Sequence, residues 1–179
     1  MPETDEAFAQ RVIDLLRHVR QVRRFTETPV PRPVIDAILE VGRWSGSSRN
    51  LQPWDLVLVQ NRDTLRAIAD AEGQSSHLGG ATFGIIIALA GSSGTEAAYD
   101  EGRLTERLMA AAEAYGVGAG IWWFRDGGAA AKQALGIPED RTVRSALSFG
   151  YPAEAPAGTG LTRKGGRRPL SDAVHEEHF

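Results

Sequence analysis

Arginines that could bind an anion form two separate clusters in this 179-residue chain. The first contains Arg20, Arg23 and Arg24, and the second lies at 163–168 near the C-terminus. Guanidinium groups pair bidentately with phosphate or carboxylate. Taken singly, the first cluster could also be a solvated helix end that suits the helix dipole, and the second a solvated tail. Because the formal net charge is −3, any anion site must be local, and neither nucleic acid nor a membrane surface is expected as a partner.

A third polar segment is the loop at 45–54, which reads SGSSRNLQPW. Ser47, Asn50 and Gln52 offer both donors and acceptors, and the small residues around them let backbone amides approach a ligand. An ordinary turn between a helix and a strand is the simpler alternative. Together, however, two arginine clusters and one amide-rich loop are what a phosphorylated heteroaromatic ligand requires.

Other kinds of chemistry find little support in the composition. The chain has no cysteine, which excludes disulfides, thiolate metal sites and a cysteine nucleophile. Its four histidines are scattered, and His175 with His178 lacks a third ligand, so no metal site is expected. No dinucleotide fingerprint or nucleophile elbow is present. The longest apolar stretch, 83–90, is too short for a membrane span, and no secretory segment is visible, so a cytoplasmic protein is expected.

Periodic apolar residues indicate the elements that would position these segments. Helices are predicted over residues 5–19, from Pro33 onward, and over 64–72, 103–115 and 129–135, with strands over 54–60, 82–90, 119–124 and 143–149. Strands and helices interleave without a domain boundary, so one domain over 1–179, of α/β or α+β class, is expected around a single sheet. The tail beyond Pro152 lacks a core pattern, although Leu170, Ala173 and Val174 suggest that it docks again.

Six short motifs, in order along residues 8–179, resemble landmarks of the nitroreductase family. They are RQVRRF at 20–25, SSRNLQPW at 47–54, GVG at 116–118, LGIP at 135–138, FGYP at 149–152 and RRPL at 167–170. Each motif is weak alone, but six in register are specific. Val19 and Gln21 depart from the pattern, since they stand where the family often has Arg and Ser.

The resemblance implies an α+β fold, with a single central, mainly antiparallel sheet between helical layers, and an intertwined homodimer with FMN at the subunit interface. It implies that the C-terminal extension, 153–179, docks on the partner subunit. The implied cofactor-binding residues are Arg20, Gln21 and Arg23 in the first segment, Ser47, Asn50 and Gln52 in the loop, Trp122 and Trp123 near the flavin ring, and Arg167 and Arg168, with Lys164, in the tail. Arg23 would lie beside the flavin pyrimidine and Arg167 at the phosphate. Trp122 and Trp123 could equally be core aromatics.

The implied activity is hydride transfer from NADPH or NADH, through flavin N5, to a nitroaromatic, quinone or other small electrophile by ping-pong kinetics. No side chain is then needed as a nucleophile. Two alternatives remain open: a specialised flavin enzyme of the same fold, for deiodination, flavin fragmentation or heterocycle dehydrogenation, and a non-catalytic flavin-binding protein. We also expect Arg49, a long cation among small residues, to influence the choice between NADPH and NADH.

Overall fold

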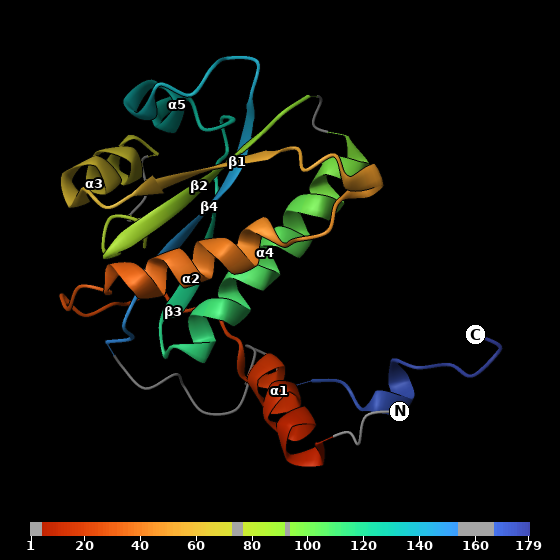
Figure 1. Ribbon diagram of the computed structural model, residues 1–179. Helices are drawn as coiled ribbons and strands as arrows, with labels where there is room; N and C mark the ends of the chain where they lie inside the picture. Colours follow the sequence, from red (N-terminus) through yellow and green to blue (C-terminus); the bar gives the residue numbers. More distant parts are fainter. Residues whose placement is uncertain (1–4, 73–76, 92–93, 154–166) are drawn as a thin grey trace.

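The computed structural model describes residues 5–72, 77–91, 94–153 and 167–179 (Figure 1). The helices in this part of the chain are α1 (Glu6–His18), α2 (Arg32–Arg43), α3 (Arg62–Ala71), α4 (Thr95–Ala114) and α5 (Ala129–Leu135). The strands are β1 (Trp54–Val59), β2 (Phe83–Leu89), β3 (Gly118–Trp123) and β4 (Thr142–Gly150). Two short 3-10 turns, η1 (Ser48–Asn50) and η2 (Leu170–Asp172), lie in the loop and the tail.

The strands form one antiparallel sheet in the order β1-β2-β4-β3. Every residue of β2 is buried, which explains why its sequence is apolar throughout and does not alternate. Strand β4, beside it, is buried over most of its length, whereas β3 lies at an edge of the described sheet. The free edge of β3 is therefore open to pairing with another segment.

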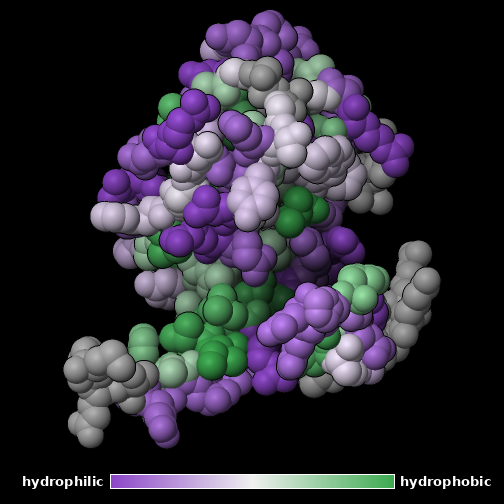
Figure 2. Space-filling model, turned by 90° about the vertical axis from the view of Figure 1, so that its right-hand side faces the viewer, coloured by the Kyte–Doolittle hydropathy of each residue, from purple (hydrophilic) through white to green (hydrophobic). Residues whose placement is uncertain are grey.

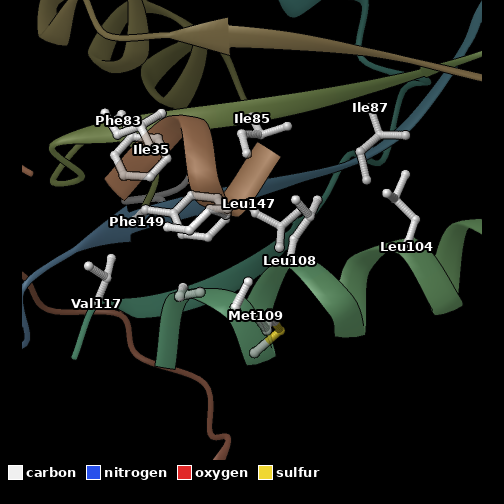
Figure 3. Packing of buried hydrophobic residues seen from close by; sticks show 14 of the residues in the cluster. Ile35, Phe83, Ile85, Ile87, Leu104, Leu108, Met109, Val117, Leu147 and Phe149 are labelled. Atoms are coloured by element: carbon white, nitrogen blue, oxygen red, sulfur yellow. The ribbon is translucent and has the colours of Figure 1, made fainter. Parts of the chain in front are cut away.

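Helices cover both faces of the sheet, which confirms the predicted α+β class and its three layers (Figure 1). On one face α2 and α4 pack against β2 and β4, in a cluster that includes Ile35, Phe83, Leu108 and Phe149 (Figure 3). The Phe83 and Phe149 rings stack with their centroids 4.6 Å apart. On the other face α3 and α5 cover a second cluster around Ile86 and Ala146.

Local capping explains several helix ends. The Asp5 side chain accepts a hydrogen bond from the Phe8 amide at the start of α1, and Asn61 does the same for Asp63 at the start of α3. Helix α5 ends at Gly136, whose φ of 65° lies in the left-handed region that glycine adopts without cost. The bounds predicted for this helix, 129–135, agree with the structure, and Gly136 explains where it ends.

One expectation needs correction. Helix α4 begins at Thr95, eight residues before the predicted start at Arg103. Its first turns lack a continuous apolar stripe because the core-facing positions hold buried carboxylates, Asp100 and Glu101. In the single chain Leu170 and Val174 of the tail are exposed, so docking of the tail on a partner subunit stays a prediction. Residues 154–166, with Lys164, lie outside the described residues.

Helix α1 projects from the body of the molecule (Figure 1). It has no buried residue, and its apolar side chains Phe8, Ile13 and Leu16 are about half exposed. In Figure 2 apolar surface, in green, lies in the lower part of the molecule, at the height where Figure 1 places α1 and the tail. No helix in the described ranges is long and apolar enough to cross a membrane.

Candidate functional site

The arginine segment after α1 crosses the sheet over three glycines. A Cβ at Gly118 would lie 2.8 Å from the Val22 side chain, and one at Gly150 would lie 2.9 Å from the Cβ of Phe25. A Cβ at Gly120 would overlap the Val22 carbonyl. Glycine is therefore required at these positions because the segment passes directly above the strands, which gives a physical reason for two of the motifs in the sequence.

Hydrogen bonds fix the backbone of this segment. The Val22 amide donates to the Ala119 carbonyl at 2.8 Å, and further along the Thr26 amide donates to the Tyr151 carbonyl at 2.8 Å. Gln21 adds a side-chain tie, because its Oε1 accepts from the Ile121 amide at 2.7 Å. The segment thus occupies part of the free edge of β3.

The two arginines predicted to bind the cofactor differ in this single chain. Arg20 donates through Nη1 to the carbonyls of Arg17 and Val19, both at 2.7 Å, and so closes the C-terminus of α1. Its Nε is buried and has no hydrogen-bond partner in the described part of the chain. Arg23 is exposed, and its guanidinium makes no hydrogen bond or ion pair with any described residue. Arg23 is therefore free to meet an anion or a developing negative charge.

The amide-rich loop is held in an unusual backbone conformation. Arg49, Asn50 and Gln52 have φ values of 50°, 55° and 48°, in the left-handed region that disfavours side-chain-bearing residues. Each such residue costs on the order of 1 kcal/mol, somewhat less for asparagine. The Gln52 amide donates to Ser47 Oγ at 2.8 Å, and the Ser48 amide donates to Asp100 Oδ2 at 2.9 Å. The loop is thus strained and held by specific contacts.

A surface pocket of about 390 Å³ lies between this loop and the first turns of α4. It is lined by Ser47, Ser48, Thr95, Glu96, Tyr99, Asp100 and Arg103. Arg49 lies nearby, with its Nη2 3.8 Å from Glu96 Oε2. Both side chains are about three-quarters exposed, so this ion pair is weak and leaves Arg49 able to meet another anion. Its effect on nucleotide choice stays a prediction.

The remaining predicted residues lie in different surroundings. Trp122 packs against the core cluster under α3 and α5, and its buried Nε1 has no acceptor among the described residues. Trp123, on the opposite face of β3, is 60% exposed. Arg167 and Arg168 are exposed in the tail. The side chain of Trp122 is therefore a core aromatic, and a role near a ligand would fall to its backbone.

One chain does not bring the arginine segment and the loop together. The Gln21 side chain reaches α4 at Met109, whereas Ser48 reaches it at Asp100. These positions are nine residues apart on one helix, which corresponds to roughly 14 Å along its axis. Figure 1 shows the two segments toward opposite ends of α4.

His77 lies in this region, and no local pattern in the sequence singles it out as a site residue. Its Nε2 lies 3.1 Å from the Ile121 carbonyl and must donate a hydrogen to it, while Nδ1 lies 2.7 Å from the Ser148 hydroxyl. The ring also meets Trp122 edge to face at a centroid distance of 5.6 Å. Burial lowers the pKa of His77, the Ile121 carbonyl opposes this, and the positive charge of Arg23 lowers it further. The imidazole links β3 to β4, and its surroundings disfavour the charged form.

This linkage predicts a pH-dependent stability. The pKa of His77 is lower in the folded than in the unfolded chain. Protonation of His77 therefore leaves the free energy of unfolding unchanged above the unfolded pKa of about 6.5, and it lowers this free energy as the pH falls below that value. The free energy of unfolding should therefore fall less steeply from pH 7 to 5 in His77→Gln than in the parent, by under about 1.4 kcal/mol per pH unit. Urea titrations would measure this, with His18→Gln as an exposed control. Equal slopes in all three proteins would contradict it.

Fold and site together define a three-layer α+β protein with an arginine segment and an amide-rich loop toward opposite ends of its longest helix. The model of the Nitroreductase family matches residues 16–82. A relative from Methanothermobacter thermautotrophicus named "Putative NADH dehydrogenase/NAD(P)H nitroreductase" is 26% identical over 151 residues, 81% of this chain and 79% of its own.

Solved structures agree with these matches. A protein of the same name from Bacteroides thetaiotaomicron superposes with a TM-score of 0.81 at 21% identity, covering 94% of this chain and 98% of that one. A "putative nitroreductase in complex with FMN" from Desulfovibrio desulfuricans gives a TM-score of 0.75 at 26% identity, with 94% and 97% covered. Residues 16–82 therefore match the Nitroreductase family, and the chain shares its fold with proteins named as nitroreductases.

Proposed function

We propose that the chain is an FMN-dependent oxidoreductase that uses NADPH or NADH to reduce a small electrophile such as a nitroaromatic or a quinone. The observation that carries this proposal is the pairing of an exposed arginine segment with a strained, donor-rich loop in a nitroreductase-like fold. The FMN bound by the Desulfovibrio protein and the NAD(P)H in the name of the archaeal relative support the choice of cofactors.

The side chains suit FMN in their chemistry. The Arg20 Nε is buried without a partner among described residues, and the exposed Arg23 guanidinium makes no hydrogen bond there. In the loop, the side-chain amide of Asn50 makes no hydrogen bond with a described residue, so its two N–H donors and its oxygen acceptor are available to a ligand. Such a set can pair with a phosphate and read the edge of a flavin ring. When bound, FMN would supply the two-electron hydride chemistry that the side chains lack.

Each group of residues has a distinct proposed task. Arg23 places a fixed positive charge beside the pyrimidine edge of the ring, and Arg167 and Arg168 in the tail hold the phosphate. Gln21 keeps the segment on the edge of β3 through its hydrogen bond with Ile121. The backbone at Trp122 and Trp123 lies next to this edge and would face the ring.

A homodimer would bring the two halves of the site together. The arginine segment and the Ser47–Gln52 loop contact α4 at points roughly 14 Å apart along its axis, so a second copy that supplies the loop would let both segments meet at the same part of one FMN. The half-exposed apolar face of α1 gives such a copy a surface to cover. Gly102, on the exposed side of α4 with open space around it, would let another helix approach closely. Sedimentation should show a dimer that retains flavin, and a flavin-loaded monomer would contradict the proposal.

Anaerobic mixing with NADPH tests the reaction itself. An oxidoreductase should lose the absorbance of its oxidised flavin within its turnover time, and a quinone should restore it. Initial rates should give parallel lines in double-reciprocal plots, because the two substrates use one site in turn. A yellow protein that NADPH leaves unchanged would instead be a flavin-binding protein without this activity.

A further inference from the structure

Asp100 is a buried carboxylate beside the amide-rich loop. Its side chain is 5% exposed, on the first turns of α4. Its Oδ2 accepts from the Ser48 amide at 2.9 Å, and its Oδ1 lies 3.6 Å from Arg103 Nη1. A buried carboxylate is costly unless it is paired and hydrogen-bonded. Its presence at a buried position therefore needs an explanation, and its short hydrogen bond with Ser48 points to the loop.

The loop that Asp100 contacts needs to be held. Arg49, Asn50 and Gln52 are left-handed, and such conformations persist only when the surroundings determine them. Within the loop, Ser47 accepts from the Gln52 amide. Outside it, the hydrogen bond from Ser48 to Asp100 anchors the same turn to α4. A charge-assisted hydrogen bond is about twice as strong as a neutral one, so Asp100 is suited to oppose the strain.

We propose that Asp100 is a positioning residue for cofactor binding, which holds the loop in the strained shape that presents Asn50 and Gln52 to FMN. This inference rests on the proposed function. Asp100 would not touch the cofactor, because its carboxylate is occupied by Ser48 and Arg103. Loss of its charge should release the loop and lower cofactor affinity while the core of the fold stays intact.

The neighbouring residue offers a matched control. Glu101 is equally buried on the same turn, but it faces the sheet, where it accepts from Arg144 Nε at 2.9 Å and from Ser145 Oγ at 2.6 Å. Both carboxylates thus anchor α4, one to the loop and the other to β4. Substitution of either by its amide should reduce stability, and only Asp100→Asn should affect the loop.

The experiment compares Asp100→Asn and Glu101→Gln with the parent protein. FMN dissociation constants come from flavin fluorescence, stability from urea unfolding, and loop order from amide hydrogen exchange at Ser48 and Gln52 without FMN. We expect Asp100→Asn to bind FMN roughly tenfold more weakly and to exchange faster at both amides. Glu101→Gln should bind within about twofold of the parent. Equal losses of affinity in both variants, or an unchanged Asp100→Asn, would overturn the proposal.

A second substitution tests the route through the loop. Arg49→Gly removes left-handed strain, because glycine adopts positive φ freely, so it should restore much of the FMN affinity when added to Asp100→Asn. Failure to restore it would show that Asp100 acts by another route. Amide hydrogen exchange at Ser48 can be measured in the parent protein without cofactor. Fast exchange at this amide would contradict the inference, whether or not Asp100→Asn folds. Parent protein that ignores FMN while Ser48 is protected would instead contradict the proposed function.

Discussion

Replacement of Arg167 by alanine should weaken FMN binding about tenfold to a hundredfold. A charge-assisted hydrogen bond to phosphate contributes roughly 1.5–3 kcal/mol. The first arginine segment is less suited to this task than the tail, since Val19 and Gln21 stand where the family often has Arg and Ser, and Arg20 already donates to carbonyls of its own chain. The tail arginines, which are exposed, should therefore provide much of the anchoring. Fluorescence titration with FMN would measure the loss.

Salt and truncation refine the test of the tail. The difference between the parent and Arg167→Ala should shrink at high ionic strength if the contact is partly exposed. Arg66→Ala is a suitable control, because Arg66 is an exposed arginine on α3 that pairs with Asp63 in the same helix. If a chain truncated after Gly160 binds FMN as tightly as the parent, the tail is not part of the FMN site.

Replacement of Arg23 by alanine should lower the reduction potential of the bound flavin. Hydride arrival at N5 places negative charge on the N1–C2 edge of the ring, and a nearby cation stabilises that reduced form more than the neutral oxidised form. A loss of about 1.5–3 kcal/mol corresponds to roughly 30–65 mV for two electrons. Reduction by NADPH should slow accordingly, while FMN affinity falls less than in Arg167→Ala.

Two further variants make the Arg23 test specific. Arg23→Lys should lie between alanine and the parent, since it keeps the charge but loses the planar fork. Arg24→Ala, one residue further along the same exposed segment, controls for a general change in local charge. A potentiometric midpoint in Arg23→Ala equal to that of the parent would show that Arg23 has no electrostatic role at the ring.

Much of the fold was predictable from local patterns in the sequence. An unbroken apolar run predicted β2, because a strand covered on both faces has no polar side. Helix α5 was predicted to the residue, and in the structure Gly136 caps its end. The start of α4 was missed because Asp100 and Glu101 lie on the same buried side of the helix as Leu104, where apolar residues are expected. Carboxylates are stable at these positions only because distant residues hydrogen-bond to them. Their helical spacing from Leu104 was the available signal.

The site was predictable in composition but not in arrangement. The motifs selected the arginine segment and the loop, yet left-handed φ at Arg49 and Gln52 depends on contacts with α4 that no local pattern encodes. His77 escaped notice for a similar reason, because its partners Ile121 and Ser148 are distant in sequence. The assignments of Arg23, Asn50 and Arg167 to a flavin remain predictions.

The most direct test of the account is the flavin content of the purified protein. The protein should be yellow, alone or after addition of FMN, should hold one FMN per chain, and should release FMN on denaturation. Under anaerobic conditions NADPH or NADH should bleach the oxidised flavin spectrum. A colourless protein that ignores added FMN, or one that releases FAD, would contradict the central claim that this chain is an FMN-dependent oxidoreductase.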